Sequence, residues 1–108
     1  MPEAPPTTTV DQLPEGAVLL DVREDDEWDA GHAPGAVHVR LGDLPARLGD
    51  LPEAELHVLC RAGGRASRAA AWLNENGYDA VVVEGGMGAW ADAGRELVAE
   101  GPGEPQVL

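Results

Sequence analysis

The segment CRAGGRAS, residues 60–67, contains the only cysteine of this 108-residue chain. Cys60 follows an apolar run and precedes an alanine-rich stretch, so we expect it where a strand ends and a helix begins. A thiolate is the reactive form of cysteine, and a helix N-terminus with adjacent cations favours that form. Arg61, Arg65 and Arg68 supply the cations. These residue types indicate a cysteine nucleophile held in a positively charged loop.

Two glycines, Gly63 and Gly64, lie inside the same loop. Glycine adopts positive φ at little cost, so the pair lets successive backbone N–H groups converge on one point. The loop is therefore predicted to form an anion-binding nest with the sulfur of Cys60 at its centre. The alternative is an inert buried cysteine, which is common in small domains. Such a cysteine needs neither the flanking arginines nor the glycines, and this favours the functional interpretation.

The sequence offers no base to pair with Cys60. His57 lies three residues earlier in the predicted strand, and an odd offset places the two side chains on opposite faces of a sheet. Acyl-transfer chemistry of the papain type is therefore not expected. His32 and His38 have no partners at metal-ligand spacing, so we predict no metal site.

The spacing of apolar residues predicts an α/β fold. Buried strands are expected at residues 17–22, 36–39, 55–60 and 80–84, with an edge strand near residues 7–10. Helices are expected at residues 24–31, 43–49, 66–76 and 85–94, the second with Asp43 as its N-cap. Runs of valine and leucine favour a parallel sheet with helices on both faces. Reactive groups of such sheets lie beyond the carboxyl ends of strands, where Asp21 and Cys60 fall.

The charge balance is strongly acidic, with 20 acidic residues, seven arginines, no lysine and a net charge of -13. A surface of this sign repels DNA and RNA, so nucleic-acid binding is not expected. A small anionic substrate needs a local basic patch, which the arginines around Cys60 provide. A single cysteine allows neither an internal disulfide nor a cysteine-based zinc site.

The length suits one domain, which we expect over residues 7–98 between flexible tails at residues 1–6 and 99–108. No apolar run approaches the roughly 20 residues of a membrane span, and the N-terminus lacks the features of a signal peptide. We therefore expect a cytoplasmic protein that does not bind membranes, in a compartment where a lone thiol stays reduced. No cofactor is predicted.

Three motifs, in this order along the chain, resemble the single-domain rhodaneses, a family of sulfurtransferases. LLDVREDDEWDAGHAPGAVHV resembles the upstream block of that family, CRAGGRAS its active-site loop, and VEGGMGAW its closing block. Together the motifs extend over about residues 7–93. Three spaced motifs in the right order are a specific signal, whereas any one of them alone would be weak.

The resemblance implies a small parallel-sheet, rhodanese-like domain that moves sulfur through Cys60. The cysteine takes a sulfane sulfur from an anionic donor such as thiosulfate and holds it as a persulfide. The sulfur then passes to a thiophilic acceptor, which is cyanide, a small thiol or a protein thiol. Arg61 and Arg65 attract the donor. The backbone N–H groups that correspond to the cradle of the outer sulfur are those of Arg61, Ala62, Gly63, Gly64 and Arg65.

Two other functions stay open at this point. The domain could be a sulfur carrier that hands sulfur to a partner protein with little small-molecule turnover. It could also be an arsenate reductase or phosphatase, since such enzymes share the fold. Those enzymes space cysteine and arginine as Cys-x5-Arg, whereas Cys60 and Arg65 are spaced as Cys-x4-Arg. The shorter ring suits a single sulfur better than a tetrahedral phosphate.

Asp21 and Arg23 are predicted to support the site from the end of a neighbouring strand. One interpretation is electrostatic tuning of the cysteine loop. The favoured one is structural, with Asp21 capping a turn and Arg23 paired to an acid such as Glu27, because such pairs mainly fix geometry.

Overall fold

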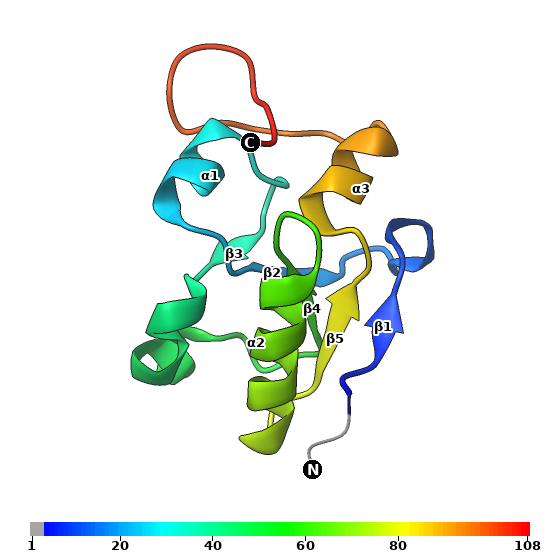
Figure 1. Ribbon diagram of the computed structural model, residues 1–108, viewed down its shortest axis with the longest axis vertical. Helices are drawn as coiled ribbons and strands as arrows, with labels where there is room; N and C mark the ends of the chain where they lie inside the picture. The colour runs from blue at the N-terminus through cyan, green and yellow to red at the C-terminus, as the bar shows by residue number, and fades with distance from the viewer. Residues whose placement is uncertain (1–3) are drawn as a thin grey trace.

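A five-stranded sheet forms the middle of the computed structural model, which describes residues 4–108 (Figure 1). The strand order is β1-β5-β4-β2-β3, and every strand pairing is parallel. The strands are β1 (Thr7–Thr8), β2 (Val18–Asp21), β3 (Val37–His38), β4 (Leu56–Leu59) and β5 (Ala80–Val83). The helices are α1 (Asp25–Ala30), α2 (Gly64–Glu75) and α3 (Gly86–Asp92), with 3₁₀ segments η1 (Val10–Gln12) and η2 (Leu41–Asp50). The predicted α/β fold is confirmed.

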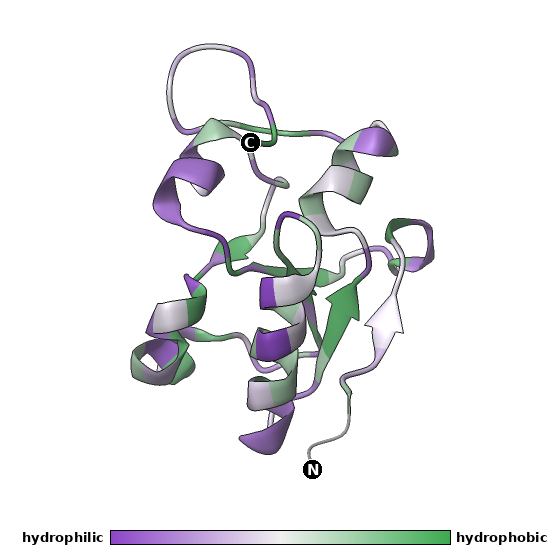
Figure 2. Ribbon diagram, in the orientation of Figure 1, coloured by the Kyte–Doolittle hydropathy of each residue, from purple (hydrophilic) through white to green (hydrophobic). Residues whose placement is uncertain are grey.

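Two apolar clusters, one on each face of the sheet, hold the helices in place. Adjacent residues of β4 separate the faces, because Val58 belongs to the cluster under α2 and Leu59 to the cluster under α3. One apolar face of α2 is buried against the sheet. Its residues Ala66, Ala69, Ala70 and Leu73 have no exposed area. Figure 2 shows β5 as uniformly hydrophobic and α1 as largely hydrophilic, in keeping with a buried strand and a surface helix.

The segment predicted as a helix at residues 43–49 differs in detail. It is the 3₁₀ segment η2, which begins two residues earlier and has a non-helical kink at Arg47. Pro45 lies inside it, and proline removes a backbone donor and disfavours a regular α-helix. The N-cap prediction for Asp43 was wrong, since Arg40 is the N-cap and the Asp43 carboxylate accepts a 2.8 Å bond from Arg40 Nε.

A buried ion pair lies at the carboxyl end of β2. Asp21 and Arg23 are fully buried, and the Asp21 carboxylate accepts 3.0 and 3.1 Å bonds from Arg23 Nε and a 2.8 Å bond from Arg23 Nη2. Arg23 Nη2 also donates to the carbonyl of Gly31 at 2.8 Å. Within residues 4–108, Arg23 Nη1 is buried without a hydrogen-bond partner. The pair ties the end of β2 to the end of α1.

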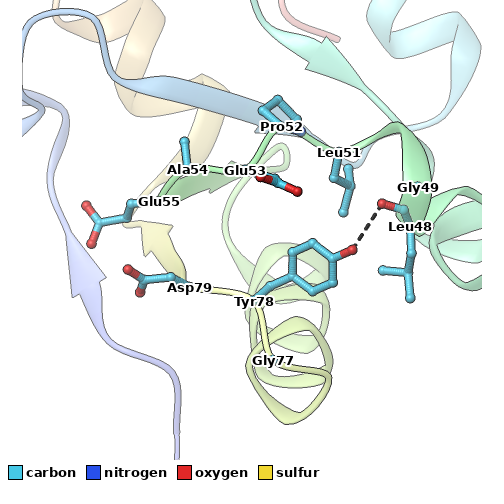
Figure 3. A pocket seen from close by; sticks show the side chains of 10 residues that line it. All are labelled: Leu48, Gly49, Leu51, Pro52, Glu53, Ala54, Glu55, Gly77, Tyr78 and Asp79. Atoms are coloured by element: carbon cyan, nitrogen blue, oxygen red, sulfur yellow. Dashed lines mark hydrogen bonds between the residues drawn. The ribbon is translucent and has the colours of Figure 1, made fainter.

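The opposite end of the sheet carries a cavity of about 560 Å³, drawn in Figure 3. Glu55 and Asp79 precede β4 and β5, so this cavity lies at the amino ends of the strands. Cys60 follows β4 at the opposite, carboxyl end. The Tyr78 hydroxyl donates to the carbonyl of Leu48 at 3.1 Å, as the dashed line in Figure 3 marks. This bond joins η2 to the segment before β5 along one side of the cavity.

The two predicted tails lie at the ends of the chain. Of the N-terminal tail predicted at residues 1–6, residues 1–3 lie outside the described part, and the carbonyl of Pro6 accepts a 2.9 Å bond from Val82 N. The flexibility predicted for residues 99–108 stays a prediction. Among the described residues no helix combines the length and the hydropathy that a membrane crossing requires.

We expect Asp21→Ala to destabilise the fold by about 3–5 kcal/mol, because it leaves the charge of Arg23 buried and unpaired. Urea unfolding at neutral pH measures this change. The control is Asp50→Ala, which breaks the exposed Arg47–Asp50 pair with its 3.0 Å contact and should cost less than about 1 kcal/mol. Equal costs for the two variants would contradict a structural role of the buried pair.

Candidate active site

Cys60 lies directly beyond β4, at the carboxyl edge of the sheet where the sequence places it. The residue is 1% exposed, and its Sγ accepts a 2.9 Å hydrogen bond from the amide of Gly63. Gly63 has φ 133° and is the N-cap of α2, so the reversal of the chain that aims this amide at the sulfur needs glycine. The sulfur therefore forms the floor of a loop, with one donor already directed at it.

The first turn of α3 sets the direction of the loop backbone. The carbonyl of Cys60 accepts a 2.8 Å bond from Met87 N, and the carbonyl of Arg61 accepts a 3.1 Å bond from Gly88 N. In a trans peptide the carbonyl and the following N–H point in opposite directions. The N–H groups of Arg61 and Ala62 therefore point away from α3, toward the face on which the Cys60 side chain packs.

Gly86 makes this close approach possible. A Cβ atom at Gly86 would overlap the carbonyl oxygen of Cys60, and the residue has φ 51°, a region that L side chains rarely adopt. In the sequence, Gly86 and its neighbour Gly85 indicate only a tight turn before α3. Its additional effect, support of the cysteine loop from behind, depends on a contact between distant segments and has no local sequence signal.

Glu27 of α1 holds the far end of the loop. Its carboxylate accepts two hydrogen bonds from Arg65, 2.6 Å from Nη1 and 2.8 Å from Nη2. Glu27 Oε1 also accepts a 3.1 Å bond from the amide of Glu24, as part of a capping box at the start of α1. Hydrogen bonding from Arg65 lowers the pKa of Glu27 from its usual 4.5 to about 2, against the effect of burial, and the same contact raises the pKa of Arg65.

This geometry corrects the predicted pairing of Arg23 with Glu27. Arg23 is bonded to Asp21 instead, and Glu27 is bonded to Arg65, the last residue of the predicted cradle. Asp21 lies beside Leu59, the residue before Cys60, in the β2–β4 register. The Asp21–Arg23 pair therefore lies next to β4. Within the described residues, the two side chains make no hydrogen bond to Cys60.

The remaining cations around Cys60 are less engaged. Arg61 is exposed and donates one bond, from Nε to the carbonyl of Leu108 at 2.8 Å. Arg68 is exposed, and among residues 4–108 no acidic side chain pairs with it. Ala62 and Gly64 are also exposed, so the rim of the loop is open to solvent while its floor is not.

The three histidines have partners elsewhere. His57 bonds the carbonyl of Val18 at 3.1 Å and lies 3.1 Å from the Glu55 carboxylate, on the face opposite to Cys60 as predicted. His32 and His38 stack on Trp28, with ring centroids 3.5 and 4.6 Å apart. Trp28 is thus a half-buried platform for two imidazoles.

A family model described as "Rhodanese-like domain" matches residues 6–93 of the chain. The chain belongs to the rhodanese-like family. It is 45% identical over 73 residues to "Putative sulfurtransferase YtwF" of Bacillus subtilis (strain 168), covering 67% of this chain and 71% of that protein. It is 38% identical over 74 residues to "Putative sulfur carrier protein YrkF" of the same organism, covering 67% of this chain and 40% of that protein.

Solved structures agree with this rhodanese-like assignment. The structure titled "Crystal Structure of Rhodanese-like Domain Protein from Staphylococcus aureus" superposes with a TM-score of 0.75 at 32% identity. The superposition covers 84% of this chain and 96% of that chain. The parallel sheet with its helices is therefore the fold of the family, and the resemblance noted in the sequence is confirmed.

We expect Glu27→Gln to lower stability at neutral pH by about 1–3 kcal/mol, because the charged partner of Arg65 is lost. The pKa of Glu27 is lower in the folded chain, so the pair contributes fully above about pH 4.5 and is lost as pH falls toward 2. The difference in unfolding free energy between wild type and variant should shrink over that window. A difference that stays constant from pH 7 to pH 2.5 would contradict the ion pair.

Proposed function

We propose that this chain is a sulfurtransferase that carries a sulfane sulfur on Cys60. The observation that carries the proposal is the backbone of the cysteine loop, where Gly63 N–H bonds Sγ and the amides of Arg61 and Ala62 point away from α3. Several amide donors around one sulfur stabilise an anion there. The names of the similar Bacillus subtilis proteins support sulfur transfer as the class of chemistry.

The first half-reaction loads the cysteine. The Cys60 thiolate attacks the outer sulfur of a thiosulfate-like donor, the sulfur–sulfur bond of the donor breaks, and sulfite leaves with the bonding electron pair. Cys60 is 1% exposed, so the donor enters through the rim formed by Arg61, Ala62 and Gly64. The amides of residues 61–65 hold the resulting persulfide anion.

The second half-reaction unloads it. The carbon of cyanide, or the sulfur of a thiolate, attacks the outer sulfur of the persulfide. The sulfur–sulfur bond of the persulfide then breaks and its electron pair returns to Cys60 as a thiolate. No net oxidation occurs with cyanide, since the sulfane sulfur moves intact to form thiocyanate. A cycle through a free thiolate suits a reducing compartment such as the cytoplasm.

The two arginines of the loop contribute differently. The guanidinium of Arg65 is bound bidentately to Glu27, so its charge is largely balanced within the chain. Arg61 has an exposed guanidinium with one bond from Nε, which leaves its Nη groups for an anionic donor. We therefore assign donor attraction mainly to Arg61 and assign Arg65 to holding the loop.

The same contact argues against phosphate or arsenate as the substrate. Arginine binds such oxyanions through two parallel N–H groups, and Glu27 takes one N–H from each Nη of Arg65 and balances its charge, which lowers its attraction for an oxyanion. Together with the Cys-x4-Arg spacing, this favours a single sulfur as the bound species.

A carrier role is the second candidate, favoured by the similarity to "Putative sulfur carrier protein YrkF" and by the exposed rim of the loop. A carrier transfers its sulfur to a protein thiol rapidly but forms thiocyanate slowly. To distinguish the two roles, the persulfide-loaded chain is mixed with cyanide in one reaction and with a reduced thiol protein in another. The rate of sulfur transfer is measured in each, and the faster acceptor identifies the function.

Incubation with thiosulfate and cyanide should yield thiocyanate, and Cys60→Ala should abolish it because the chain has no other thiol. Intact-mass analysis after thiosulfate treatment should show one added sulfur atom on the wild type, removable by cyanide. The matched control is Asp50→Ala, which changes an exposed residue outside the cysteine loop and should keep wild-type turnover. Persistent thiocyanate formation by Cys60→Ala would refute the proposal.

A further inference from the structure

An apolar groove of about 180 Å³ lies between α2 and η2, and its walls are formed by Leu41, Leu44, Pro45 and Trp72. Figure 1 shows η2 beside the labelled helix α2, and the two elements are in contact. Leu44 is buried, Leu41 and Trp72 are half-buried, and Pro45 is exposed. A cavity of about 150 Å³ with apolar walls holds a molecule of the size of benzene. The groove therefore fits one apolar side chain rather than a whole ligand of drug size.

One face of α2 connects this groove with the cysteine loop. Arg65, Arg68 and Trp72 fall at i, i+3 and i+7 of the helix, so their side chains lie in one row. The helix begins at Gly64, a residue of the exposed rim. With a rise of about 1.5 Å per residue, Arg68 lies about 6 Å and Trp72 about 12 Å along the helix from that rim. A segment that reaches Cys60 through the rim can therefore contact Arg68 and the groove as well.

Arg68 is a positive charge without an acidic partner inside the chain. It is exposed, and within the described part of the chain its guanidinium forms no ion pair. The acids on the neighbouring elements are already engaged, since Glu27 pairs with Arg65 and Asp43 pairs with Arg40. In a chain of net charge -13, most of the surface repels an acidic partner. Arg68 therefore marks a place beside the loop where an acidic side chain is attracted.

We propose that Arg68 and the groove at Trp72 dock the protein thiol that accepts sulfur from Cys60. This role rests on the proposed sulfur transfer by Cys60. The occupant is an extended segment of the acceptor protein that carries a cysteine, an acidic residue and an apolar residue. At about 3.3 Å per extended residue, the acidic residue lies about two positions from the cysteine and the apolar residue about four. Glu75, about one turn beyond Trp72, repels an acid, so the acidic residue belongs between the other two.

Transfer to this acceptor is an exchange between sulfur atoms. The acceptor thiol gives its proton to solvent, and the resulting thiolate attacks the outer sulfur of the Cys60 persulfide. A sulfur–sulfur bond forms on the acceptor, and the bond to Cys60 breaks with its electron pair left on the Cys60 thiolate. Docking raises the effective concentration of the acceptor thiol at the rim. It therefore accelerates transfer to a docked thiol and leaves transfer to cyanide as it is.

Short peptides test this order of side chains on the unmodified chain. In the reference peptide glutamate lies two positions from cysteine and leucine four, with glycine elsewhere, and the peptide is made in both chain directions. The faster direction should take sulfur from the persulfide-loaded chain about three- to tenfold faster, per thiolate, than a twin with lysine in place of glutamate. A twin with serine in place of leucine should also be about three- to tenfold slower. Equal rates for all the peptides would overturn the proposal.

Arg68→Glu should invert the charge preference, so that the lysine peptide becomes the faster acceptor. Both proteins react with the same two peptides, so any difference in thiol reactivity between the peptides cancels. The matched control is Arg95→Glu, which replaces an exposed arginine over Trp90 on the opposite face of the sheet and should keep the wild-type preference. Trp72→Ala should reduce the ratio of the leucine and serine rates to less than about twofold. A charge preference unchanged by Arg68→Glu would overturn the proposal.

Peptides with serine in place of cysteine separate docking from sulfur transfer. They cannot accept sulfur, so an NMR titration with them reports binding alone, and shifts are expected at the amides of Leu41, Arg68 and Trp72. If thiosulfate loads no sulfur on the chain while these shifts follow the preference for glutamate, sulfur transfer fails and the docking surface stands. If the persulfide forms and passes to cyanide while all the thiol peptides react at equal rates, the docking surface fails alone.

Discussion

The site depends on one backbone contact, the packing of the Cys60 and Arg61 carbonyls onto the first amides of α3. This contact fixes two peptide planes and directs their N–H groups away from α3. It exists only because Gly86 lacks a side chain at the point of closest approach. The cysteine loop and the closing motif are therefore one unit, although Gly86 lies 26 positions after Cys60 in the chain.

Ion pairs then fix the loop from the side of α1 and β2. Among residues 4–108, four of the seven arginines pair with an acidic side chain, and Arg65 pairs with Glu27. A bidentate contact fixes both orientation and distance, so this pairing holds Arg65 in place at the end of the loop. Arg61 lies on the other side, where its Nε donates to a backbone oxygen of Leu108.

The sequence predicted those features that follow from periodicity or from local chemistry. The structure has the expected helix after the cysteine loop, the strand before Cys60 and the loop at the sheet edge. Each is encoded within a few neighbouring residues. The partner of Glu27 and the support from Gly86 were not predictable, because both require knowledge of which distant segments meet. The helix predicted at residues 43–49 is a kinked 3₁₀ segment because Pro45 lies inside it.

The position of Cys60 directly after β4 explains both the burial of its sulfur and the exposure of the loop rim. β4 is a central strand, and a residue that directly continues it lies at the level of the sheet, below the loop that turns into α2. The thiol of Cys60 is then reached only past the rim, where Arg61 is the one loop cation whose Nη groups bond no side chain among residues 4–108. In the proposed function, recognition of a small anion falls to the rim, and stabilisation of the transferred sulfur falls to the amides beneath it. We infer from this division that a small domain needs only an open rim, and not a large pocket, to receive a charged donor.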